Sequence, residues 1–265
     1  MTHWFDIGVN MPDKRLPLEE VINGAEAQDV LGIVLIGTDV EQSQQALELT
    51  RDASAVHLAA TAGVHPHNAK DVKQGYIEEL RQLASAQNVV AIGECGLDFN
   101  RNFSPADAQL RVFEQQLELA CELGLPVYLH ERDAFEPQIR LLNQYAPRLK
   151  GAIVHCFTGS KQQAEAYLQL GFSIGITGWV CDPKRGDALR EALSVIPLDR
   201  LLLETDAPYL MPKTLKTKSR NNQPANLPHI AQEVAAIKKV DIQYLKQCCW
   251  RNSINFFELE SDFAG

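Results

Sequence analysis

Short apolar runs alternate with longer amphipathic stretches along the chain. Eight runs are rich in Val, Ile and Leu at consecutive positions, which is typical of strands buried on both faces. They span residues 4–9, 32–38, 57–64, 89–93, 126–130, 151–157, 172–177 and 201–205. The stretches between them carry apolar residues at helical spacing. We expect helices at residues 18–29, 41–51, 77–86, 106–123, 134–145, 161–170 and 187–195, and two more at 227–238 and 242–257.

Eight strands that alternate with helices predict parallel β-α-β units. The chain has 265 residues, close to the roughly 250 of a (β/α)8 TIM barrel. The alternative is an open doubly wound sheet, which usually carries a glycine-rich turn after its first strand. Here Asn10, Met11, Pro12 and Asp13 follow the first run. The pattern therefore favours an α/β fold, a single TIM-barrel domain over residues 1–265.

The composition indicates where this protein would work. Its six cysteines include no C-x-x-C pair, so a zinc-finger or redox motif is not expected. The first residues form neither a basic nor an apolar segment, and no apolar run approaches the ~20 residues that span a membrane. We expect a cytoplasmic protein with reduced thiols and no membrane partner.

The net charge of −9 gives no overall attraction to nucleic acid. A polyanionic substrate must therefore meet local cations. Lys213, Lys216, Lys218 and Arg220 lie in the long irregular stretch 207–225, where barrels often bind phosphate after their last strands. Such a run is also compatible with a solvated loop, and the sequence alone leaves both interpretations open.

Several histidines and carboxylates lie where the predicted strands end, the edge at which barrels place their catalytic residues. They are His65, His67, Glu94, His130, His155 and Asp206. Imidazole and carboxylate together suit Zn²⁺, Mn²⁺ or Mg²⁺, and a bridging carboxylate suits two ions about 3.5–4 Å apart. Because neighbours on a strand face opposite ways, we expect Cys95 and Cys156 to point away from this site and to serve packing.

Four stretches make the chain resemble the TatD family of metal-dependent deoxyribonucleases, within the amidohydrolase-like barrels. They are AGVHPH at 62–67, AIGECGLDF at 91–99, HCFTG at 155–159 and ETDAPY at 204–209. The resemblance covers nearly the whole chain. It implies a metallo-dependent hydrolase barrel whose metal ligands are Glu94, His130, His155 and Asp206.

The same resemblance implies roles for the residues around the metal. The expected catalytic residues are His65, Glu94 and Asp206, with His65 at the scissile phosphate or assisting proton transfer and Asp206 on the metal or the water. The expected substrate contacts are His65, His67, Tyr209 and Arg220.

The first strand departs from the family pattern. Most members open with an aspartate followed by His-x-His, whereas this chain has Gly8 and Asn10 at the two histidine positions. Gly8 has no side chain and Asn10 offers only a neutral carbonyl oxygen, so one metal site is expected to be weak or empty. With fewer imidazoles the site fits Mg²⁺ better than Zn²⁺; Mg²⁺ is the expected cofactor, with Mn²⁺ or Zn²⁺ as the alternatives.

The opening, with FNRNF at 99–103 and GWVCD at 178–182, resembles the bacterial members after which the family is named. That resemblance implies a monomeric, cytoplasmic, magnesium-dependent 3′–5′ exonuclease. Its substrate would be single-stranded DNA or RNA, and its role repair of oxidative DNA damage. Phe99, Phe103, Trp179 or Tyr209 would stack a base or serve packing.

The sequence is also compatible with two other functions. A lactonase or amidohydrolase would use the same barrel on a small molecule, although such enzymes usually keep the strand-one histidines. A binding protein with a decayed metal site is the other, suggested by the altered first strand and opposed by the intact Glu94, His130, His155 and Asp206.

Overall fold

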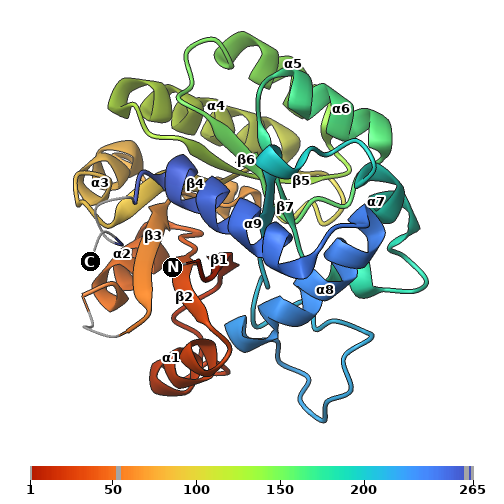
Figure 1. The fold of residues 1–265 in the computed structure, drawn as a ribbon. Coiled ribbons are helices and arrows are strands. Elements are labelled where there is room, and N and C mark those ends of the chain that lie inside the picture. Colours follow the sequence, from red (N-terminus) through yellow and green to blue (C-terminus); the bar gives the residue numbers. More distant parts are fainter. Residues whose placement is uncertain (1, 52–54, 260–262, 264–265) are drawn as a thin grey trace.

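A computed structural model describes residues 2–51, 55–259 and 263. Eight parallel strands follow one another in chain order around a single sheet, and helices surround it (Figure 1). The strands are β1 (Trp4–Val9), β2 (Val30–Leu35), β3 (His57–Ala62), β4 (Val89–Asp98), β5 (Val127–Arg132), β6 (Ala152–Val154), β7 (Ser173–Ile176) and β8 (Leu201–Leu203). All eight predicted strands are present.

The sheet closes where β1 meets the segment after β8. Val9 pairs with Ala207 in parallel orientation. The backbone N–H of Asn10 donates to the Ala207 carbonyl at 2.8 Å, and the backbone N–H of Asp206 donates to the Gly8 carbonyl at 2.9 Å. The barrel prediction is therefore confirmed, and the closure brings the first strand beside Asp206.

Nine helices of the described residues follow the predicted pattern. They are α1 (Leu18–Ala27), α2 (Val40–Leu49), α3 (Tyr76–Leu83), α4 (Ala106–Leu123), α5 (Phe135–Tyr145), α6 (Lys161–Gln169), α7 (Asp187–Ala192), α8 (Leu227–Lys238) and α9 (Ile242–Phe257). The last one packs Trp250 and Phe257 against Phe5 of β1, with ring centroids 6.1 Å apart in both pairs. This helix covers the amino-terminal end of the barrel and leaves the opposite end for a site. No helix in the described ranges has the length and apolar character to cross a membrane.

Strand β4 is longer than the apolar pattern predicts. It continues from Gly93 to Asp98 because β5 runs alongside, pairing Gly96 with His130 and Asp98 with Arg132. Buried glutamines support the extension: Gln109 accepts the Asp98 amide at 2.8 Å, and Gln138 accepts the Leu97 amide at 3.0 Å. Residues beyond the predicted end of the strand therefore extend the barrel wall toward the site.

Candidate metal centre

A cavity of about 570 Å³ opens at the carboxyl ends of the strands. The predicted residues converge on it from five strands or the turns that follow them. Its lining includes Asn10, His65, His67, Glu94, Asp98, Arg101, His130, Arg132, His155, Trp179, Asp206 and Tyr209. The structure thus brings together every expected site residue except Arg220.

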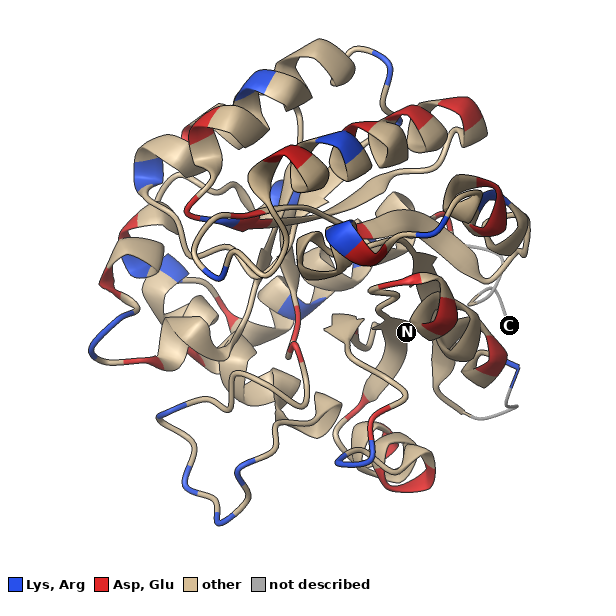
Figure 2. Cartoon of the chain, turned by 180° about the vertical axis from the view of Figure 1, so that it is seen from behind, with Lys and Arg blue, Asp and Glu red and all other residues tan. Residues whose placement is uncertain are grey.

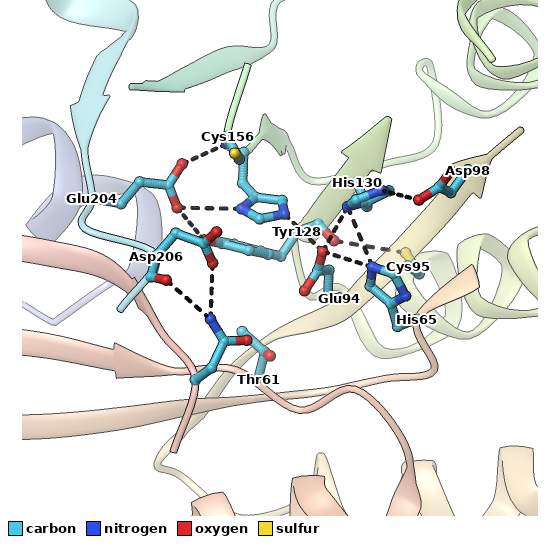
Figure 3. A network of polar contacts seen from close by, with 12 residues as sticks. Thr61, His65, Glu94, Cys95, Asp98, Tyr128, His130, Cys156, Glu204 and Asp206 are labelled. Atoms are coloured by element: carbon cyan, nitrogen blue, oxygen red, sulfur yellow. Dashed lines mark hydrogen bonds and ion pairs between the residues drawn. The ribbon is translucent and has the colours of Figure 1, made fainter. Parts of the chain in front are cut away.

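One oxygen of Glu94 is the centre of the cluster (Figure 3). Glu94 Oε1 lies 2.8 Å from His130 Nδ1, 2.8 Å from His155 Nε2 and 3.3 Å from His65 Nε2. Burial by itself would raise the pKa of this carboxyl, but the surrounding histidines, His155 foremost, hold it well below its usual range. Glu94 therefore carries its negative charge in the buried site.

Three of these residues meet the spacing that a bound cation requires. Ligand atoms of His65, Glu94 and His130 all lie within 4.8 Å of one another. Burial lowers the pKa of His65 to about 4, so its imidazole is neutral. Its Nδ1 accepts the His67 backbone amide at 3.0 Å, which leaves the ring proton on Nε2, the atom that faces Glu94. Nitrogen and carboxylate donors in this arrangement suit a divalent metal ion. The grouping places His65 closer to the ligand set than the sequence suggested.

His155 is held from its other side by Glu204. Glu204 is fully buried; its Oε2 lies 3.3 Å from His155 Nδ1 and accepts the Tyr128 hydroxyl at 2.6 Å. Its Oε1 accepts the Cys156 amide at 2.5 Å. The Tyr128 ring also stacks on the His155 ring with centroids 4.7 Å apart. Such carboxylate–imidazole contacts orient a ligand toward a metal.

The space beside Gly8 explains why the first strand lacks a side chain there. A Cβ on Gly8 would lie 2.3 Å from Tyr128 Oη and 2.5 Å from Glu204 Oε2. The Tyr128–Glu204 pair therefore occupies the volume that a histidine at position 8 would need. Sequence reasoning gave neither Tyr128 nor Glu204 a role. The available signals both concerned Glu204: it opens the ETDAPY stretch and directly follows the three leucines of β8.

Asn10 orients Asp206. Its Nδ2 donates to Asp206 Oδ1 at 2.8 Å and to the Ala207 carbonyl at 3.2 Å, so the amide nitrogen faces the aspartate. Burial raises the pKa of Asp206 to about 7, and the nearby Glu204 and Glu94 add to the effect. A carboxyl with a pKa near neutrality can exchange a proton at working pH.

Asp98 supports the histidines on the other side of the cavity. Its Oδ2 lies 2.6 Å from His67 Nε2 and 3.5 Å from His130 Nε2. Burial would raise its pKa, but these histidines and the Arg101 amide lower it well below its ordinary value. His67 is thus anchored by a carboxylate at the cavity wall, an arrangement that its place in the sequence did not predict.

The two cysteines beside the site behave differently. Cys95 is buried, with Sγ 3.9 Å from the Tyr128 carbonyl, as expected of packing. The prediction for Cys156 was wrong, because this residue lines the cavity. Strand β6 ends at Val154, and Cys156 has a φ of 45°. The alternation of a strand therefore does not apply there.

The candidate substrate contacts divide into two groups. The first group lines the cavity and consists of Tyr209, which is 49% exposed, and Trp179. The second group lies outside the lining: Phe103 is 53% exposed, and Phe99 packs against the core. Arg220 is exposed and is not part of the cavity lining. The stretch with Lys213, Lys216 and Lys218 extends outward from the barrel as a long loop (Figure 2).

Comparisons with known proteins agree with this geometry. Residues 5–258 match the family described as TatD related DNase. A protein of Erwinia billingiae named 3'-5' ssDNA/RNA exonuclease TatD is 46% identical over 96% of this chain and 99% of its own length. A Salmonella typhimurium protein of the same name is 47% identical over the same shares.

Solved structures show the same architecture. A hydrolase TatD family protein from Entamoeba histolytica aligns with a TM-score of 0.87 at 26% identity, covering 97% of this chain and 98% of that one. The Escherichia coli TatD homologue YJJV aligns with a TM-score of 0.85 at 28% identity, covering 96% and 98%. The family match over residues 5–258 and these relatives show that the chain belongs to the family of TatD-related DNases.

Proposed function

We propose that this protein is a metal-dependent nuclease that hydrolyses phosphodiester bonds. The observation that carries the proposal is the set of histidines around one oxygen of Glu94 on the floor of an open cavity. The relatives named 3'-5' ssDNA/RNA exonuclease support the finer proposal, removal of nucleotides from the 3′ end of single-stranded DNA or RNA.

Glu94, His130, His155 and Asp206 would hold the divalent ion, with His65 adjacent. The chemistry that such an ion supplies is polarisation of a phosphate oxygen and a water of lowered pKa. Mg²⁺ is the proposed ion, because Gly8 adds no ligand and the Asn10 amide nitrogen is directed to Asp206. Mn²⁺ and Zn²⁺ are the alternatives for the same donors.

The remaining residues have distinct tasks in this proposal. Asp206, held by Asn10, orients or deprotonates the attacking water. His65 is neutral and donates a hydrogen bond to the scissile phosphate. His67, fixed by Asp98, and Tyr209 contact the substrate at the cavity wall. We also propose a monomer that acts in the cytoplasm in repair of oxidative DNA damage.

The deciding experiment is a product ladder from 5′-labelled single-stranded DNA. With Mg²⁺ we expect stepwise shortening from the 3′ end. EDTA or Glu94→Ala should abolish it, while circular dichroism of the variant stays native. Near-normal activity of the folded variant would refute the role of Glu94 in the reaction. Hydrolysis of lactones in place of DNA would identify a small-molecule hydrolase, and DNA binding without turnover in any metal would identify a decayed site.

A further inference from the structure

Two arginines at the rim of the cavity form no ion pair within the described part of the chain. Arg101 follows β4 and Arg132 ends β5, and both line the cavity. Neither guanidinium forms an ion pair with any described residue, and unlike the exposed Arg140 of α5, both face the cavity that holds Glu94. In a chain with a net charge of −9, two unneutralised cations above a buried metal-binding group are available to a phosphate.

Trp179 lies beside Arg132 in the same lining. It belongs to the short 3-10 helix η2 (Gly178–Cys181) that follows β7. Its indole nitrogen donates to the Arg185 carbonyl at 3.2 Å, and the Arg185 guanidinium lies 4.3 Å from the ring centroid. Arg185 is in turn bound to Asp182 at 2.9 Å. The indole is therefore held in a fixed orientation by groups outside the cavity.

The contact between Trp179 and Arg132 is looser. The Arg132 guanidinium lies 5.6 Å from the ring centroid and, unlike Arg185, has no carboxylate to anchor it among the described residues. Arg132 can thus adjust to a ligand while the ring stays in place. A fixed aromatic ring next to an adaptable guanidinium is suited to one nucleotide, whose base stacks and whose phosphate is charged.

We propose that Arg101, Arg132 and Trp179 form the subsite for the nucleotide adjacent to the scissile bond. The arginines bind its phosphate and the Trp179 ring stacks its base. This proposal rests on the proposed nuclease function and specifies how its substrate is held. It also assigns the attraction of the polyanion to the rim of the cavity instead of Lys213, Lys216 and Lys218, which are not part of the lining.

The subsite gives a physical reason for a preference for single strands. A base can stack on a protein ring only when its own face is free, and in a duplex both faces are covered by neighbouring bases. Base–aromatic stacking changes affinity by about 5- to 150-fold per base. Because the ring recognises any base face, we expect little dependence on which base is present.

The test compares Trp179→Leu, Trp179→Phe and Arg132→Gln with the wild type on two substrates. One is a single-stranded dT10 and the other is bis(p-nitrophenyl) phosphate, which has no adjacent nucleotide. For Trp179→Leu, we expect the ratio of kcat/KM on dT10 to that on the small diester to fall about 5- to 150-fold. Trp179→Phe should recover most of it. Arg140→Gln, an exposed arginine of α5, is the matched charge control and should leave the ratio unchanged.

A second substrate separates stacking from a structural role. On a dT10 with one abasic site next to the scissile bond, wild type and Trp179→Leu should become equal. Binding of dT10 measured by fluorescence anisotropy in EDTA tests the subsite without turnover. In that measurement, Arg132→Gln should reduce the slope of log Kd against log salt by about 0.7, because one phosphate contact with a single strand contributes about that much to the slope.

Two results would overturn the subsite. One is an equal loss for Trp179→Leu on both substrates, which would place the effect at the reacting centre. The other is unchanged dT10 binding and kinetics in both Trp179→Leu and Arg132→Gln. Failure of the nuclease proposal would look different, because no diester would be hydrolysed while the anisotropy measurement would still report the subsite.

Discussion

Tyr128→Phe tests whether the buried contact to Glu204 holds the site together. The substitution removes one hydroxyl, which donates to Glu204 Oε2 at 2.6 Å in a fully buried position. Afterwards, of its contacts with the described residues, that oxygen keeps the one to His155 Nδ1, at 3.3 Å. A hydrogen bond to a charged group contributes about 1.5–3 kcal/mol. We therefore expect the free energy of unfolding to fall by about 2 kcal/mol and Tm by roughly 4–8 °C.

The same change should weaken metal binding, because Glu204 orients His155. Contacts behind a ligand typically alter metal affinity 10- to 100-fold. Since Tyr128 acts through Glu204, we expect the lower end, a Kd for Mn²⁺ raised about 10-fold. Urea unfolding of the metal-free protein and Mn²⁺ titration followed by electron paramagnetic resonance measure the two effects separately.

Tyr167→Phe is the matched control. Tyr167 is as deeply buried as Tyr128, but its hydroxyl forms no hydrogen bond with a carboxylate in the described part of the chain. Its removal should change stability by less than about 0.5 kcal/mol and leave Mn²⁺ binding unaltered. If Tyr128→Phe and Tyr167→Phe behaved alike in both measurements, the reasoning about the Tyr128–Glu204 pair would be refuted.

Two further substitutions test the first strand. Gly8→Ala should destabilise the protein by about 1–3 kcal/mol through overpacking, since the new Cβ would meet Tyr128 Oη at 2.3 Å. Tyr128→Phe should lower the free energy of unfolding less in the Gly8→Ala variant than in the wild type. If the two effects in urea unfolding were strictly additive, that result would contradict the clash. Burial raises the pKa of Asp6 from 3.8 to about 7, because the folded protein accommodates the protonated acid better than the carboxylate. The contribution of Asp6 to the free energy of unfolding is therefore fully present below pH 4 and is lost as the pH rises through 7. Relative to Asp6→Asn, which does not titrate, the wild type should lose up to about 4 kcal/mol between pH 4 and pH 8; a difference independent of pH would show that Asp6 is not buried as a protonated acid.

The barrel was predictable because its strands are covered on both faces. Such strands need continuous apolar residues, and eight of them in alternation with helices leave few other architectures. The end of β4 was not predictable in the same way. Residues Glu94 to Asp98 form a strand through pairing with β5, and that pairing follows from no local pattern.

The candidate site was predictable only as far as strand ends determine it. Glu94, His130 and His155 lie where the apolar runs stop, and parallel strands bring those ends together. The partners behind them depend on contacts across the barrel, such as Tyr128 with Glu204, 76 residues apart. Cys156 departs from the strand alternation because its backbone is left-handed, a property that the residue type does not reveal. The lysines of the β8–α8 loop were candidates for phosphate binding because they follow Asp206 closely in the sequence. Closeness in the sequence does not determine whether a loop turns toward the cavity or away from it.

The crowding at Gly8 has a consequence for how such barrels change during evolution. A histidine at position 8 requires that the carboxylate of Glu204 and the hydroxyl of Tyr128 first move or disappear. Removing either of them alone leaves His155 without part of its support. Each single step between this arrangement and one with a strand-one histidine therefore passes through a damaged intermediate. Glu204 belongs to the ETDAPY stretch that this chain shares with the family, most of whose members keep the histidine. Tyr128 is therefore the residue that should change together with position 8, and exchanging either position between relatives should succeed only when the other is exchanged with it.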